Sequence, residues 1–331
     1  MNLHCVDQGE NGYNDHKDAR VDRRGILRLC ALTLAASAGG LKNLPRGAEL
    51  PSRRLTIKPY TWEGPYSEMR NNGAKHDWRL CAEVRAPWMT QGERLIVRSS
   101  EVVGYETGFL YDDHFPPSEP EGRGKHYHHI PFRWKEPRDN RSLSANCLVP
   151  NKGEFSLAMS AREDYLDIVL SLRNDLSTAM GEIDWAFCVV GIESASFSDS
   201  ARTRTYLFDG HGLRTFDELR RDPKMELFNV TPGHGFVPAG HKMLSVSPVE
   251  AKASVVMVES PDRRHVAALG FERAYAIYGD AIGNKCFHAD PYFGPLRKPG
   301  EKRTVKGRLY LMDGTAESAF ARFQRDFPVT A

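Results

Sequence analysis

Side chains that can bind a metal ion or transfer protons are concentrated in residues 111–134. The candidate groups there are Asp112, Asp113, His114, His126, His128 and His129. Side chains alternate between the two sides of an extended strand, so His126 and His128 face one side and His129 faces the other. Two imidazoles on one side could contact the same metal ion, with a further ligand supplied from elsewhere.

We therefore predict a candidate site for one divalent metal ion, with His114, His126 and His128 as its ligands. A His-x-His pair also occurs by chance in sequences. The alternative is a solvated histidine cluster in a loop, whose imidazoles only form hydrogen bonds with their surroundings.

A second stretch, residues 284–301, combines a histidine, an aspartate and aromatic side chains. His288 and Asp290 face the same side if this stretch is extended. A carboxylate beside an imidazole can orient the ring and raise its basicity, which favours proton transfer. Tyr292 and Phe293 add flat apolar surface. The alternative is that Asp290 begins a turn with the proline that follows it, and that the aromatic side chains belong to the core.

Together the two stretches predict one pocket, provided that the strand carrying His288 packs beside residues 126–134. The groups that we expect to transfer protons there are His126, Tyr127, His128, His288 and Asp290. The groups that we expect to bind the substrate are His129, Trp134, Arg204 and Tyr292.

Most of the sequence that would position these groups alternates between apolar and polar residues, which is typical of strands. Two hairpins are predicted, one from residues 154–160 and 165–172, the other from residues 254–259 and 265–271. Further strands are expected at residues 94–103, 183–190, 203–208 and 304–312, and helical spacing occurs only at residues 315–327. The sequence therefore predicts a mostly β fold, a large antiparallel β-sandwich with a short C-terminal helix.

The N-terminal residues have the layout of an export signal. Arg23 and Arg24 precede a short apolar run that ends in small residues at Ala38, and a paired arginine is typical of the twin-arginine route. We predict an export signal in residues 1–38, one β-sandwich domain in residues 39–331, and a periplasmic or secreted location. The alternatives are a buried helix or a membrane anchor, but the apolar run is shorter than the ~20 residues of a spanning helix, so stable membrane insertion is not expected.

The composition excludes several classes of function. With 45 Lys and Arg against 43 Asp and Glu, the net charge is +2, which is too low to attract a polyanion, so nucleic acid is not an expected partner. The sequence contains no P-loop, no G-x-G-x-x-G after a strand and no G-x-S-x-G. Phosphate, dinucleotide and serine-hydrolase chemistry therefore lack support.

Four cysteines follow the predicted signal, and they are far apart with no C-x-x-C pair. A zinc ribbon or a thioredoxin-like site is therefore unsupported. An oxidising compartment permits disulfides, but Cys188 and Cys286 lie in apolar contexts, and we expect them to be small buried thiols.

Several segments from Tyr165 onward carry a family resemblance. They are Ser171-Leu172-Arg173-Asn174, Asp184-Trp185-Ala186-Phe187-Cys188, Cys286-x-His288-x-Asp290-Pro291, Pro299-Gly300-Glu301 and Gly307-Arg308-Leu309-Tyr310-Leu311. This pattern resembles exported β-sandwich proteins of environmental bacteria, whose layout is similar to the galactose-mutarotase-like sandwiches of carbohydrate-active enzymes, polysaccharide lyases included. The resemblance covers about half of the chain, contains no diagnostic catalytic motif, and implies a sugar-related role. It also implies that the concave face of one sheet presents His, Tyr, Arg and Trp side chains to a saccharide.

The predicted function is an exported enzyme that cleaves a polysaccharide or glycoside by β-elimination, with His and Tyr as acid-base groups. Elimination is preferred because imidazoles cluster in the sequence more clearly than paired carboxylates do. The alternatives are a glycoside hydrolase on the same scaffold and a sandwich that binds glycans without catalysis.

The paired arginine makes the export route testable. Replacing both Arg23 and Arg24 by Lys should retain the protein in the cytoplasm, because the twin-arginine receptor recognises that pair. The measurement is the fraction of protein recovered from the periplasm, with Arg28→Lys as a control within the same signal. Normal periplasmic recovery of the double variant would contradict the prediction.

Overall fold

The computed structural model describes most of the chain after residue 53. Contacts within the chain divide it into residues 1–50 and residues 51–331, and all described residues belong to the second unit. The predicted export signal, residues 1–38, lies outside the described residues. The described ranges are 54–62, 76–105, 108–112, 133–135, 139–219, 226–230, 245–280, 283 and 285–328.

The larger of two sheets, sheet A, has nine strands within these ranges, in the order β1, β2, β3, β8, β16, β15, β11, β12, with β4 paired to β3. Neighbouring strands are antiparallel except β11 and β12, which are parallel. The strands are β1 Thr56–Trp62, β2 His76–Arg85, β3 Leu95–Tyr105, β4 Gly108–Asp112, β8 Ile183–Val190, β11 Glu226–Asn229, β12 Ser245–Val246, β15 Ala274–Asp280 and β16 Cys286–Pro291.

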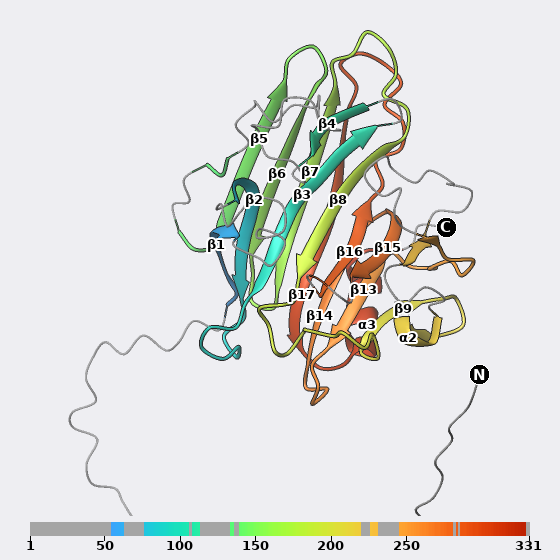
Figure 1. Ribbon diagram of the computed structural model, residues 1–331. Helices are drawn as coiled ribbons and strands as arrows, with labels where there is room; N and C mark the ends of the chain where they lie inside the picture. Colours follow the sequence, from blue (N-terminus) through green and yellow to red (C-terminus); the bar gives the residue numbers. More distant parts are fainter. Residues whose placement is uncertain are drawn as a thin grey trace, which may run out of the picture. The chain divides into compact units, whose positions relative to one another are not determined.

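The second sheet, sheet B, has eight antiparallel strands within the described ranges, in the order β10, β9, β13, β14, β17, β7, β6, β5. Figure 1 shows its strands layered with those of sheet A. The strands are β5 Ser142–Val149, β6 Gly153–Ala161, β7 Tyr165–Asn174, β9 Thr205–Phe208, β10 Leu213–Thr215, β13 Val255–Glu259, β14 His265–Phe271 and β17 Lys302–Asp313.

The predicted mostly antiparallel β-sandwich with a short C-terminal helix is confirmed. The predicted hairpins correspond to β6–β7 and β13–β14, and the further predicted strands correspond to β3, β8, β9 and β17. Two helices complete the described elements, the one-turn α2 at Phe216–Leu219 and α3 at Ala316–Asp326. No helix in the described ranges is long and apolar enough to cross a membrane.

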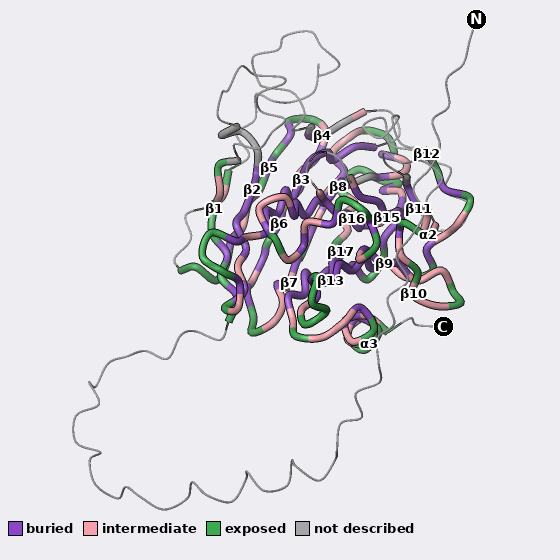
Figure 2. Tube along the Cα trace, turned by 60° about the horizontal axis from the view of Figure 1, so that its bottom comes forward, coloured by how far each residue is buried: buried purple, intermediate pink, exposed green. Residues whose placement is uncertain are grey.

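The core lies between the inner faces of the two sheets. Sheet A contributes side chains such as Phe187 and Phe287, and sheet B contributes Leu170 and Leu309. Because strand side chains alternate, the neighbours of Phe287 along β16 point to the opposite side, which we call the outer face of sheet A. These neighbours are buried as well, and Figure 2 shows buried residues running along the central strands.

The part of the outer face of sheet B formed by β13, β14 and the end of β17 is apolar and is covered by α3. Ala316, Ala319 and Phe323 of this helix pack on side chains of β13, β14 and β17. Gly270 on β14 permits this close approach, because a Cβ atom there would lie 2.5 Å from the Phe323 ring. The outer face of sheet A differs from this part of sheet B, because its buried residues include ionisable groups.

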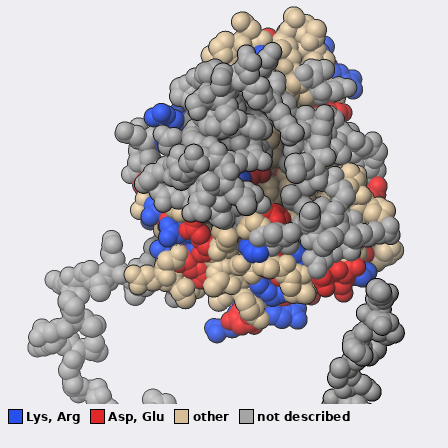
Figure 3. Space-filling view, viewed as in Figure 1, with Lys and Arg blue, Asp and Glu red and all other residues tan. Residues whose placement is uncertain are grey.

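Charges of both signs are mixed on one face of the described residues. Figure 3 shows Lys and Arg side chains interspersed with Asp and Glu side chains on the described part of one face. This mixture agrees with the net charge of +2.

A buried glutamate connects the loop before β3 to the loop after β8. Glu93 accepts hydrogen bonds from the Ser194 hydroxyl at 2.7 Å, from the Ser196 N–H at 2.9 Å and from the Thr90 N–H at 3.3 Å. Burial raises the pKa of Glu93, but these hydrogen bonds outweigh it and lower the pKa to about 2. The ionised carboxylate therefore stabilises the end of the sheet where β3 begins.

We predict that Glu93→Gln lowers the free energy of unfolding at pH 7 by roughly 1–3 kcal/mol, since an amide cannot satisfy the same set of donors. The native pKa lies below the unfolded value of about 4.3, so the stabilisation is present above that value and is lost as the pH falls toward 2. Urea unfolding should show the same difference from the parent protein at pH 7 and pH 5 and a smaller difference at pH 3, with the exposed Glu163→Gln as control. A difference that is the same at all three pH values would contradict the prediction.

Candidate functional site

The middle of sheet A places three ionisable side chains of β16 in a row. Cys286, His288 and Asp290 are spaced by two residues, so all three lie on the outer face. In the strand register, His288 lies opposite Cys188 of β8 on one side and opposite Tyr278 of β15 on the other. Residues about a hundred positions apart in sequence therefore meet at this point.

Six buried ionisable groups form what we call the outer-face cluster. Each member is at most 6% exposed. Protein partners rather than water must therefore offset the cost of burying its polar or charged atoms. The members are Arg98 and Glu101 of β3, Cys188 of β8, and Cys286, His288 and Asp290 of β16.

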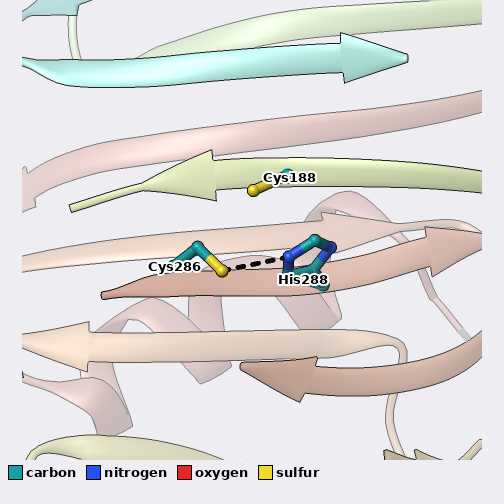
Figure 4. Close-up of side chains that lie close together, drawn as sticks. All are labelled: Cys188, Cys286 and His288. Carbon is teal, nitrogen blue, oxygen red and sulfur yellow. Dashed lines mark hydrogen bonds between the residues drawn. The ribbon is translucent and has the colours of Figure 1, made fainter. Parts of the chain in front are cut away.

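His288 is the centre of this cluster. Its Nε2 atom lies 3.2 Å from Cys286 Sγ, the contact drawn in Figure 4, and the Tyr278 ring stacks on the imidazole at a centroid distance of 4.1 Å. Its Nδ1 atom lies 3.8 Å from Asp290 Oδ1 and 3.9 Å from Glu101 Oε2. This buried Nδ1 atom has no hydrogen-bond partner among the described residues.

Irregularities in two strands bring further groups to the cluster. In β3, Arg98 pairs with Cys188 and Val102 pairs with Ala186, so three residues of β3 lie opposite the single residue Phe187 of β8 and form a bulge in the ladder. Glu101 lies in this bulge. Bulges change the direction in which a side chain points, and here the Glu101 carboxylate reaches His288.

A second irregularity occurs in β15, where Ala274 pairs with Pro291 and Ala276 pairs with Asp290. Tyr275 is the additional residue, and its hydroxyl donates to Asp290 Oδ2 at 3.3 Å. The other carboxylate oxygen, Asp290 Oδ1, accepts the Phe187 N–H at 3.0 Å. Hydrogen bonds therefore satisfy both oxygens of a fully buried carboxylate.

The cluster favours charged forms of the Cys286 and His288 side chains. A hydrogen bond from Cys188 lowers the pKa of the Cys286 thiol against the effect of burial, and the positive charge of His288 lowers it further. Burial lowers the pKa of His288, but the negative charges of Cys286 and Glu101 and the interaction with the Asp290 side chain outweigh it and raise this pKa. Burial raises the pKa of Cys188. The Cys286 thiol and the His288 imidazole thus shift each other's pKa in the direction of the charged forms.

All four cysteines after the predicted signal are buried and none forms a disulfide, as expected for Cys188 and Cys286. One ligand atom from each of Cys188, Cys286 and His288 lies within 4.8 Å of the other two. Figure 4 shows Cys188 on the strand beside the one that carries the other two residues. The outer-face cluster therefore offers both proton-transfer groups and metal-ligating atoms.

The structure describes five of the residues that sequence reasoning proposed for the site. His288 and Asp290 lie together on β16, within a strand rather than a turn. Tyr292 follows them and packs, half-buried, against a tyrosine-rich cluster on β15. Trp134 and Arg204 lie elsewhere: the Trp134 indole donates to the carbonyl of Cys81 at 2.8 Å, and the Arg204 guanidinium donates to backbone carbonyls, including that of Ser198 at 2.8 Å.

The remaining predicted site residues lie outside the described residues. Their predicted roles in catalysis, substrate binding and metal binding stay predictions, and so does the idea that they share a pocket with His288. These residues are His114, His126, Tyr127, His128 and His129.

Sequence reasoning missed several members of the site. The signal for Cys286 was present, because a Cys-x-His-x-Asp run in a strand places all three side chains on one face. Arg98 and Glu101 are charged residues inside a predicted strand of mostly apolar character, which also indicates a buried ion pair. Tyr275 carried no such signal, because its position depends on the bulge in β15.

Comparison with known proteins gives only distant similarities. No protein-family model matches the chain, and no curated protein matches it. A galactose mutarotase related enzyme from Lactobacillus acidophilus is 11% identical, with 71% of this chain and 91% of that chain covered and a TM-score of 0.40. A galactose mutarotase-like protein from Clostridium acetobutylicum is 11% identical, with 79% and 99% covered and a TM-score of 0.36.

An α-N-acetylgalactosaminidase from Bifidobacterium bifidum is 12% identical, with a TM-score of 0.42, and the match covers 76% of this chain but 36% of that one. Matches at these identities and TM-scores assign neither a family nor an activity to this chain. They include the galactose-mutarotase-like group that the sequence pattern resembles.

The buried ion pair between Arg98 and Glu101 predicts a strong mutational effect. Arg98→Met should lower the free energy of unfolding by about 3–5 kcal/mol, because it leaves a buried carboxylate without its cation, and the double variant with Glu101→Leu should recover much of the loss. Urea unfolding of both single variants and the double variant measures this coupling. Arg162→Met, at the exposed ion pair with Asp167, is the control and should have a much smaller effect, because exposed ion pairs contribute little to stability. Equal losses for Arg98→Met and Arg162→Met would contradict the prediction.

Proposed function

We propose that the protein is an exported carbohydrate-active enzyme whose reaction, a β-elimination, takes place at the outer-face cluster. The observation that carries the proposal is the pair of acid-base groups formed by Tyr275 and Asp290. Their oxygens are 3.3 Å apart, and both side chains are buried on the outer face of sheet A. A carboxylate and a phenol in direct contact can pass a proton between them.

The pair can complete a cycle without a net gain or loss of protons. The Asp290 carboxylate accepts the proton from the carbon next to a sugar carboxylate, and the electrons of that C–H bond form a C=C double bond as the C–O bond to the leaving sugar breaks. Tyr275 donates its phenolic proton to the leaving oxygen. The proton on Asp290 then passes to the Tyr275 oxygen through their hydrogen bond, which restores both groups.

The neighbouring aromatic side chains support a saccharide as substrate. Tyr275 and Tyr278 form one apolar cluster on β15, and Tyr292 is its half-buried member. Flat aromatic faces of this kind stack on sugar rings, and the half-buried position of Tyr292 makes it the side chain that an entering sugar would meet first. The sequence resemblance to carbohydrate-active sandwiches supports the same class of substrate.

A second candidate is glycoside hydrolysis, which a pair of carboxylates can catalyse. One observation favours it: Asp290 and Glu101 both approach His288 Nδ1, at 3.8 and 3.9 Å. The reaction products separate the two candidates. Elimination yields an unsaturated sugar that absorbs ultraviolet light, whereas hydrolysis yields new reducing ends without unsaturation. Binding of a glycan without either product would favour the non-catalytic alternative.

We predict that Tyr275→Phe reduces the rate of polysaccharide cleavage by ~10²–10⁴-fold, because it removes one proton-transfer group while keeping the ring. The measurement is a screen of the full chain on plant and algal polysaccharides, followed by kinetics of parent and variant on the best substrate. Loss of a single hydrogen bond should lower the free energy of unfolding by only about 1 kcal/mol.

Tyr206→Phe is the matched control, because the Tyr206 hydroxyl also contacts a carboxylate, Glu259 Oε2, at 3.3 Å but on sheet B. This variant should keep the parent rate. A Tyr275→Phe enzyme as fast as the parent would overturn the proposed role of the pair.

A further inference from the structure

We propose that Cys188, Cys286 and His288 form a binding site for one divalent, thiophilic metal ion of the zinc class. The three ligands of this site are different residues from the predicted metal ligands His114, His126 and His128. The site also does not depend on the proposed reaction, because Tyr275 and Asp290, the groups of that reaction, are not among its ligands.

The sheet backbone fixes the three ligands in position. Cys286 and His288 are two residues apart on β16 and therefore point to the same side. Cys188 lies on β8 directly opposite His288 in the antiparallel register. Both strands are central in sheet A, so their relative placement is set by backbone hydrogen bonds and not by a loop. Figure 4 shows the three side chains gathered on these neighbouring strands.

The distances fit a tetrahedral ion. Zinc binds sulfur at about 2.3 Å and nitrogen at about 2.0 Å, which places tetrahedral ligand atoms roughly 3.5–3.8 Å from one another. The ligand atoms of the three residues lie within 4.8 Å of one another, and Cys286 Sγ lies 3.2 Å from His288 Nε2. Small side-chain rotations would therefore be sufficient to place an ion among them.

The unpaired nitrogen of His288 is a second observation that points to a ligand. His288 is 2% exposed, and its Nδ1 atom has no hydrogen-bond partner among the described residues. It faces the carboxylates of Asp290 and Glu101 at 3.8 and 3.9 Å. A histidine that binds a metal through Nε2 carries a proton on Nδ1, and a nearby carboxylate commonly accepts that proton. Asp290 and Glu101 therefore lie on the side of the ring where a metal-binding histidine needs an acceptor for its Nδ1 proton.

The ligand types select the ion. Thiolate and imidazole ligands suit zinc, whereas calcium and magnesium require oxygen ligands. Two thiolates would balance the charge of a divalent ion, and Glu101 already neutralises Arg98. Three protein ligands leave a fourth tetrahedral position for water or a substrate atom.

Metal analysis of the full chain tests the site. Protein from zinc-supplemented cells, purified without chelators, should contain close to one zinc per chain by mass spectrometry. Exchange with Co²⁺ should produce the sulfur-to-cobalt charge-transfer absorption and the intense visible bands of a tetrahedral thiolate site. Cys188→Ser and Cys286→Ser should each weaken Co²⁺ binding by more than ~100-fold, since loss of a ligand exceeds the 10–100-fold effect of losing an outer-shell partner.

Cys81→Ser is the matched control. Cys81 is buried in the same apolar group on the outer face as Cys188 and Cys286, yet it is not one of the three ligands. This variant should bind Co²⁺ like the parent. If the ligand variants do not fold, alkylation of the parent chain in mild urea provides a second measurement, in which Zn²⁺ should slow the labelling of Cys188 and Cys286 more than that of Cys81 and Cys147.

Several results would overturn the proposed metal site. They are zinc contents near zero after exposure to Zn²⁺, Co²⁺ spectra without thiolate bands, parent-like binding by the Cys188→Ser and Cys286→Ser double variant, and a disulfide between Cys188 and Cys286. None of these readouts measures saccharide cleavage. Tyr275→Phe, which tests the proposed reaction, should keep its metal, so failure of one proposal is distinguishable from failure of the other.

Discussion

The position of β16 between β8 and β15 is the constraint on which the candidate site depends. Backbone hydrogen bonds use both edges of this strand, and both of its faces are buried. Phe287 therefore belongs to the core while His288 belongs to the outer face. A shift of one residue in the register would exchange these two positions, placing an imidazole in the apolar core. The apolar requirement of the core thus fixes the location of the ionisable groups.

The second constraint is the cost of burying charge. Buried ionised groups are tolerated only where partners compensate the loss of water. Side chains of the outer-face cluster have such partners. Arg98 and Glu101 neutralise each other, and Asp290 accepts two hydrogen bonds. The bulges in β3 and β15 are essential to this arrangement, because a regular ladder would place neither Glu101 nor Tyr275 at the same point. Irregular pairing is therefore part of how the site is built.

The sequence predicted those parts of the fold that depend on local signals. The β13–β14 hairpin follows from a turn in which Asp262 accepts hydrogen bonds from the Ser260 hydroxyl and the Arg264 N–H. The placement of Cys286, His288 and Asp290 on one face of β16 follows from the two-residue period of a strand alone. By contrast, the pairing of Cys188 with His288 joins distant segments, and alternation gives no sign of an extra residue in a ladder. Long-range register and bulges are tertiary outcomes, so the complete cluster could not be derived from sequence patterns.

Packing alone does not explain the composition of the outer-face cluster. Ile96 and Val190 lie beside Cys188 and Cys286 on the same face and are fully buried, so apolar side chains are accommodated there. Replacing buried ionic groups by apolar ones of similar volume is often neutral or stabilising, and a thiol, an imidazole and two carboxylates therefore bring no advantage in stability over an extended apolar patch. Buried ionisable groups with shifted pKa values gathered at one point are typical of functional sites. The chemistry of these side chains, rather than their contribution to the core, accounts best for their presence at the centre of sheet A.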